Sequence, residues 1–122
     1  MLRPDYYLPI MPYLVVSSSE EFIRFIKATF NAKDELIVPR EDGSIMHAEF
    51  SLNNGSIMFT QATEEYPVFP CSMFLLVEDI DDAYSRGLAA GAISLQSIED
   101  REYGRSAGLK DSCGNVWWLT NK

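Results

Sequence analysis

Histidine is nearly absent from this chain, since His47 is the single one among 122 residues. One imidazole excludes a two-histidine iron site and a histidine-rich zinc site built within one chain. Cysteine is also scarce: Cys71 and Cys113 form no Cys-x-x-Cys pair, which disfavours a zinc ribbon and a thioredoxin-type redox site. Because the first residues lack the pattern of a secretory signal, we expect free thiols and a cytoplasmic protein.

Basic residues and long apolar runs are equally limited. Ten Lys and Arg stand against 18 Asp and Glu, a net charge of −8 without a basic cluster, which argues against nucleic acid as a partner. The apolar stretch at 8–16 contains Pro9 and Pro12 and is too short to span a membrane. The 47% of hydrophobic residues argue against disorder, so we expect one compact domain over residues 1–122.

What the sequence does contain is one pattern of elements repeated twice. Each half predicts a strand, a helix and three further strands, with helix caps at Ser18 and Asp79 and helix ends at Asn31 and Gly91. The predicted strands lie at 10–16, 35–39, 45–52 and 56–61, and again at 71–77, 93–98, 105–110 and 115–120. Matching landmarks are about 60 positions apart, which predicts a duplication with modules at about 8–62 and about 71–122.

Several phrases in this order resemble a known family. They are PYLVV at 12–16, MHAEF at 46–50, VEDID at 77–81, YGRS at 103–106, and Asp111 followed by GNVWW at 114–118. Together they are similar to the PhnB-like branch of the vicinal oxygen chelate superfamily, the glyoxalase/bleomycin resistance protein/dioxygenase group. The resemblance implies an α+β fold of two tandem βαβββ modules, whose mixed sheet forms a cup with the helices outside, and it implies a homodimer. The turn that usually reads Asp-Pro-Phe-Gly here reads DSCG.

In this family, metal ligands lie at equivalent points of the first and last strand of each module. By alignment of the halves, these points are Tyr13, Phe59, Phe74 and Trp118. A neutral tyrosine is a poor ligand, and phenylalanine and tryptophan offer a cation no donor atom. The resemblance therefore predicts a cup without metal or other cofactor. Met58, next to Phe59, is expected to face the helices as part of the core.

These aromatic side chains have two interpretations. They fill the cup as ordinary core, or they line a pocket for a small organic ligand that is planar and aromatic or cationic. The resemblance places Tyr103 and Arg105 at the edge of the cup. Arg105 then either binds an anionic group of the ligand or forms a salt bridge to Glu49, Asp111 or a partner chain.

His47 and Glu49 form the one acid and base pair suggested by spacing. Residues two apart on a strand share a face, so both side chains are expected to point into the cup, while Ala48 and Phe50 point towards the helix. A carboxylate beside an imidazole orients it as a general base, although a plain hydrogen-bonded pair fits the same spacing. The leading hypothesis is a metal-free protein that binds a small molecule. The alternative is an isomerase, lyase or transferase, with or without a metal, that uses His47 as general base and Arg105 as anion clamp.

Overall fold

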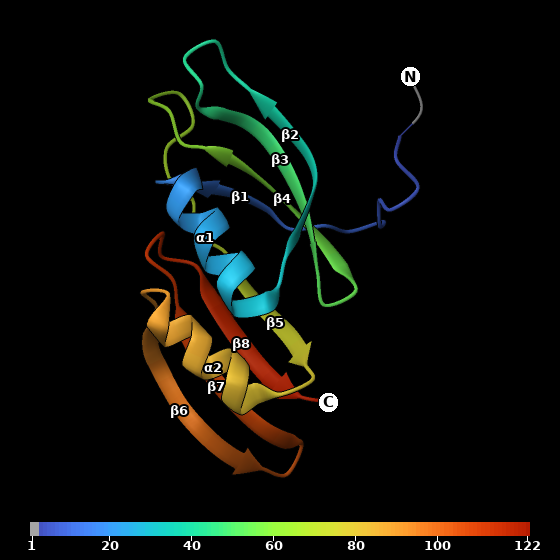
Figure 1. The fold of residues 1–122 in the computed structure, drawn as a ribbon, viewed down its shortest axis with the longest axis vertical. Coiled ribbons are helices and arrows are strands. Elements are labelled where there is room, and N and C mark those ends of the chain that lie inside the picture. Colours follow the sequence, from blue (N-terminus) through green and yellow to red (C-terminus); the bar gives the residue numbers. More distant parts are fainter. Residues whose placement is uncertain (1–2) are drawn as a thin grey trace.

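The computed structural model describes residues 3–122, which form two four-stranded sheets, each with one helix (Figure 1). The first half contains β1 (Tyr13–Val16), α1 (Ser19–Phe30), β2 (Lys33–Pro39), β3 (Ile45–Leu52) and β4 (Gly55–Gln61). The second half contains β5 (Ser72–Val77), α2 (Ile80–Ala89), β6 (Ile93–Arg101), β7 (Gly104–Lys110) and β8 (Val116–Asn121).

Both sheets have the same topology. Their strand orders are β1-β4-β3-β2 and β5-β8-β7-β6, so the first strand of each half lies beside the last. That pair is parallel, and the other neighbours are antiparallel. The repeated strand and helix order confirms the predicted α+β fold of two βαβββ modules.

Local sequence explains where the helices begin and end. The Ser18 side chain accepts a hydrogen bond from the Glu21 amide at 3.2 Å, and Asp79 caps α2 in the same way. Asn31 ends α1 in the left-handed conformation, with φ of 55°, which asparagine tolerates better than most residues. These three predicted boundaries are confirmed.

The hydrophobic core lies between the sheets and the two helices, which pack side by side on one face of the molecule (Figure 1). It is shared between the two halves. Trp117 of β8 packs against α1, with ring centroids 5.8 Å from Phe25 and 5.0 Å from Phe30. Because a side chain of the second sheet inserts among those of the first helix, the duplicated halves form one continuous core.

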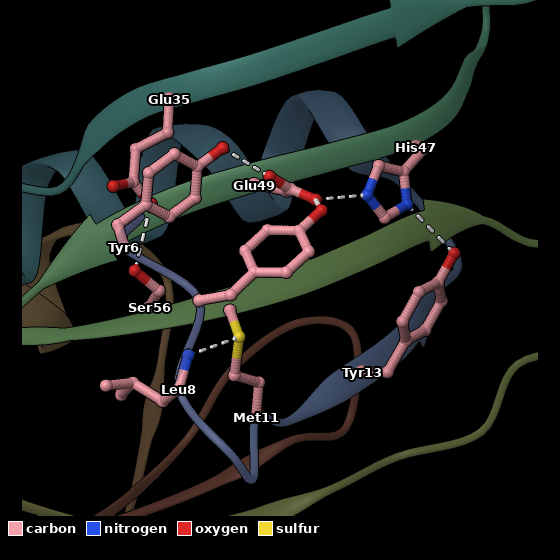
Figure 2. A network of polar contacts seen from close by, with 9 residues as sticks. Tyr6, Leu8, Met11, Tyr13, Glu35, His47, Glu49 and Ser56 are labelled. Carbon is pink, nitrogen blue, oxygen red and sulfur yellow. Dashed lines mark hydrogen bonds and ion pairs between the residues drawn. The ribbon is translucent and has the colours of Figure 1, made fainter. Parts of the chain in front are cut away.

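The sheet faces turned away from the helices are called the open faces. Residues 3–12, called the N-terminal segment, contain no helix or strand and cross the open face of the first sheet, as Figure 2 shows in front of β3 and β4. Within the described range of 3–122, neither helix is long and apolar enough to cross a membrane. The open faces carry the candidate site residues His47, Glu49, Phe74 and Trp118, which are described next.

Candidate functional site

A polar chain of side chains occupies the open face of the first sheet (Figure 2). His47 and Glu49 of β3 project together from this face, as predicted, while Ala48 and Phe50 between and beside them are buried in the core. His47 Nε2 lies 2.7 Å from Glu49 Oε2, and the Tyr13 hydroxyl lies 3.1 Å from His47 Nδ1. The imidazole is therefore held at both nitrogens.

Two tyrosines of the N-terminal segment complete this chain. The Tyr6 hydroxyl donates to Glu49 Oε1, and the Tyr7 hydroxyl donates to Oε2 at 2.5 Å. With these contacts Glu49 is fully buried, at 0% exposure. Neither tyrosine was predicted as a site residue, because the segment has no helical or alternating pattern that would assign it to a face of the sheet. Two consecutive tyrosines before the first strand indicate hydrogen-bonding side chains there, but not their partner.

These hydrogen bonds determine the charge states of the Glu49 carboxylate and of the two tyrosine hydroxyls. Burial alone raises the pKa of Glu49, but hydrogen bonds from Tyr6, Tyr7 and His47 outweigh it and lower that pKa below its ordinary value. The same hydrogen bonds to the carboxylate raise the pKa of both Tyr6 and Tyr7. Glu49 is thus a buried carboxylate at neutral pH, and the two phenols remain protonated donors.

Aromatic side chains gather on the open face of the second sheet. Phe74, Tyr103 and Trp118 are 63%, 68% and 40% exposed and border a hollow of about 310 Å³. Gln96, Ser106 and Thr120 add polar groups to its lining. The structure therefore brings together three of the predicted ligand-binding residues, on one sheet.

A wider groove of about 550 Å³ runs between the two sheets. Leu8 and Ile10 of the N-terminal segment line one side of it, and Phe74 and Leu76 of β5 line the other. Phe74 borders both this groove and the aromatic hollow. The groove and the aromatic hollow therefore meet at the Phe74 side chain.

The prediction for Phe59 is wrong. Phe59 is 0% exposed and packs on the helix side, 4.8 Å from the Phe22 ring in α1. Met58 occupies the open face instead, paired in register with Tyr13, just as Trp118 pairs with Phe74. The expectation that Met58 faces the helices is therefore also wrong. Side chains alternate along a strand, so an alignment error of one residue exchanged the two faces.

The prediction for Arg105 is also corrected. Its guanidinium points to the helix layer, where it lies 2.9 Å from Asp81 in α2 and 3.0 Å from Asp100 in β6. Neither Glu49 nor Asp111, the two partners within the chain expected from the sequence, is involved. Because both neighbouring carboxylates already engage it away from the open face, Arg105 takes no part in the aromatic hollow.

Comparison with known proteins now gives the family. The family model of the Glyoxalase/Bleomycin resistance protein/Dioxygenase superfamily matches residues 5–119, nearly the whole chain. The chain belongs to this superfamily. Mb0911c, an uncharacterized protein of Mycobacterium bovis, is 29% identical to this chain in an alignment that covers 90% of this chain and 80% of that protein.

Solved structures show the same superfamily fold. TioX from Micromonospora sp. ML1 superposes with a TM-score of 0.76 at 24% identity, over 94% of this chain and 96% of TioX. A putative 3-demethylubiquinone-9 3-methyltransferase, PhnB protein, from Bacillus cereus gives 0.75 at 22% identity, over 94% and 100%. TnmS3, an antibiotic binding protein from Streptomyces sp. CB03234, gives 0.71 at 19% identity, over 94% and 98%.

In the glyoxalase/bleomycin resistance/dioxygenase superfamily, four strand positions are expected to hold a metal, so the residues at these positions decide whether this chain can bind one. With the register corrected, they carry Tyr13, Met58, Phe74 and Trp118. A thioether is a soft ligand, and the aromatic side chains supply no carboxylate or imidazole. Across residues 3–122, no three His, Cys, Asp or Glu side chains converge as a metal site. The residues present do not fit a divalent metal.

Proposed function

We propose that this protein binds a small organic ligand, planar and aromatic or cationic, without metal or other cofactor. The observation that carries the proposal is the exposure of Phe74, Tyr103 and Trp118 around one hollow. Large aromatic side chains grouped on an exposed surface are typical of binding sites, because leaving them in water forgoes the free energy of burying them. Stacking on such rings favours flat and positively charged ligands.

The surroundings of the hollow support this proposal. Gln96, Ser106 and Thr120 supply the few polar groups that orient a ligand in a mostly apolar site. The net charge of −8 favours the approach of a cation. TnmS3, which shares the fold, is an antibiotic binding protein. The corrected metal positions agree with a binding site that is free of metal.

A cytoplasmic homodimer completes the proposal. Tyr13, Phe74, Leu76 and Trp118 all remain 40% exposed or more on the open faces of a single chain. A second copy that faces them would bury these residues and enclose the ligand. Light scattering on the purified protein measures the mass in solution, and a monomeric mass contradicts the homodimer.

The binding test uses proflavine, a planar aromatic cation whose fluorescence reports its environment. We expect saturable binding, weakened at least tenfold in Phe74→Ala and in Trp118→Ala. Tyr66→Ala removes an exposed ring from the linker and is the matched control, with unchanged affinity. Equal affinity in all four proteins contradicts an aromatic binding surface. Stoichiometric zinc, nickel or iron in elemental analysis of the purified protein contradicts the metal-free state.

An enzyme is the second candidate, on the evidence of His47. The buried Glu49 carboxylate 2.7 Å away holds the ring as an orienting carboxylate holds a general base. However, Tyr13 occupies the other ring nitrogen, so a substrate must displace Tyr13 before His47 can accept its proton. This isomerase, lyase or transferase alternative predicts turnover in a screen of small carbonyl compounds that is lost in His47→Ala while proflavine binding remains. Arg105 has no place in it as an anion clamp.

A further inference from the structure

The Glu49 carboxylate is covered in an unusual way. Neither a helix nor a strand covers it on the open face; the N-terminal segment does (Figure 2). The hydrogen bonds that shape the segment are internal to it, from Tyr7 N to Pro4 O and from Leu8 N to Met11 Sδ. Pro12 O, at its end, accepts from Met58 N of β4. The contacts at Tyr6 and Tyr7 therefore fasten the middle of this segment to the sheet.

Those two contacts are alike in chemistry. Each phenolic hydroxyl donates to its own oxygen of the Glu49 carboxylate, and the two rings pack edge to face with centroids 5.4 Å apart. A buried carboxylate is costly unless hydrogen bonds replace the lost water. Hydrogen bonds to a charged acceptor are among the strongest in proteins. The carboxylate and its surroundings thus form a site with two phenol positions, both filled.

We propose that Glu49 and His47 form a receptor for phenolic hydroxyl groups, in which Tyr6 and Tyr7 are exchangeable occupants that a hydroxylated aromatic ligand displaces. This site lies on the first sheet, apart from the aromatic hollow of the second. Leu8 and Ile10, next along the N-terminal segment, border the groove that shares Phe74 with that hollow. The inference goes beyond the proposed function, because it assigns a second site and the chemical class of its ligand.

The geometry also says what such a ligand needs. A tethered tyrosine competes at a high effective concentration, so a simple phenol displaces it poorly. A ligand with two hydroxyl groups, or with further apolar surface to lie in the groove, overcomes that competition. Ile10 is 88% exposed and Leu8 is 49% exposed, so lifting the segment costs little buried apolar area at these two residues.

The test compares 4-fluorophenol with 4-fluoroanisole by ¹⁹F NMR titration. The double variant Tyr6→Phe/Tyr7→Phe keeps both rings and removes both competing hydroxyls. We expect it to bind 4-fluorophenol at least tenfold more tightly than the unchanged protein does. The gain should be absent for 4-fluoroanisole, which has no hydroxyl hydrogen to donate. Adding Glu49→Gln to the double variant should abolish the gain, because the charged acceptor is gone.

Two outcomes overturn the inference. One is equal affinity for 4-fluorophenol in the unchanged protein and the double variant, since the hydroxyls then block nothing. The other is an equal gain for 4-fluoroanisole, which would indicate apolar exposure rather than phenol recognition. Circular dichroism verifies folding, and should the double variant not fold, Tyr7→Phe alone, with a smaller expected gain, carries the same comparison. Failure here leaves proflavine binding on the second sheet unaffected, so the two proposals are separable.

Discussion

The indole ring of Trp118 lies directly against Gly108 on the neighbouring strand. A Cβ atom at position 108 would stand 2.5 Å from Cζ3 of that ring and 2.8 Å from Cε3, closer than real contacts allow. Gly108 pairs with Trp118 in the ladder between β7 and β8. The absence of a side chain at this position therefore sets where the ring lies in the aromatic hollow.

Gly108→Ala should weaken proflavine binding at least tenfold without unfolding the protein. Trp118 is 40% exposed, so its ring has room to swing outward when the methyl group arrives. Proflavine titration and tryptophan emission measure the two effects. Gly55→Ala is the control, because a Cβ there meets only Leu52 O, at an ordinary 3.6 Å. Binding by Gly108→Ala equal to that of Gly55→Ala contradicts the role given to the ring.

Glu49 should make the stability of the protein sensitive to acid. Its pKa in the folded protein lies below the ordinary 4.5, so folding favours the carboxylate. That contribution is fully present above the unfolded pKa and is lost as pH falls through the folded pKa. Between about pH 6 and about pH 3, the free energy of unfolding should fall more steeply in the unchanged protein than in Glu49→Gln.

Urea unfolding at each pH measures this difference. Glu65→Gln, in the exposed linker, is the control for the loss of one negative charge. Parallel pH curves for the unchanged protein and Glu49→Gln would show that the carboxylate gains nothing from its tyrosine and histidine partners.

Asp111 should be among the most important carboxylates for stability. It is buried, and it accepts hydrogen bonds from the amides of Cys113 at 2.9 Å and Asn115 at 3.0 Å and from Trp117 Nε1 at 2.8 Å. Asp111→Ala leaves these buried donors unsatisfied, so we expect a loss of about 3 kcal/mol in urea unfolding. Asp82→Ala removes an exposed pair with Arg86 and should cost less than about 0.5 kcal/mol. Similar losses in the two variants contradict this ranking.

Arg105→Ala should leave proflavine binding within twofold of the unchanged protein. Its guanidinium lies on the helix side with Asp81 and Asp100, and exposed ion pairs of this kind contribute little to stability. Tyr103→Ala, two positions away but at the rim of the hollow, should weaken binding. A larger loss of proflavine affinity in Arg105→Ala than in Tyr103→Ala would contradict this placement and indicate that Arg105 belongs to the binding site.

The fold follows from sequence where patterns are periodic. Ser18, Asn31 and Asp79 mark helix boundaries by chemistry that acts within a few residues, and alternation along β3 places His47 and Glu49 on one face. Phe59 shows the limit of this reasoning. The glycines near the starts of the last strands, Gly55 and Gly114, are 59 positions apart, but the paired positions Met58 and Trp118 are 60 apart. Met58 follows its glycine by three positions and Trp118 follows its own by four, so a turn glycine does not fix strand register.

Contacts between distant segments were beyond the reach of sequence patterns. The partner of Arg105 depends on how α2 lies over β7, and no local spacing encodes that. Tyr6 and Tyr7 precede the first strand without any helical or alternating pattern, so nothing in the sequence assigned them to Glu49. The aromatic hollow was predicted in part, because Phe74 and Trp118 lie on adjacent strands with the same orientation.

The placement of Trp117 among the phenylalanines of α1 has a consequence for how the protein unfolds. Its ring centroid lies within 6.2 Å of those of Phe22, Phe25 and Phe30, although Trp117 belongs to the second repeat and the three phenylalanines belong to the first. Neither repeat can melt without exposing aromatic surface of the other, so heating should give a single cooperative transition. The two topologically equivalent repeats therefore unfold as one cooperative unit. A fragment containing one repeat alone would lack side chains that complete its hydrophobic core.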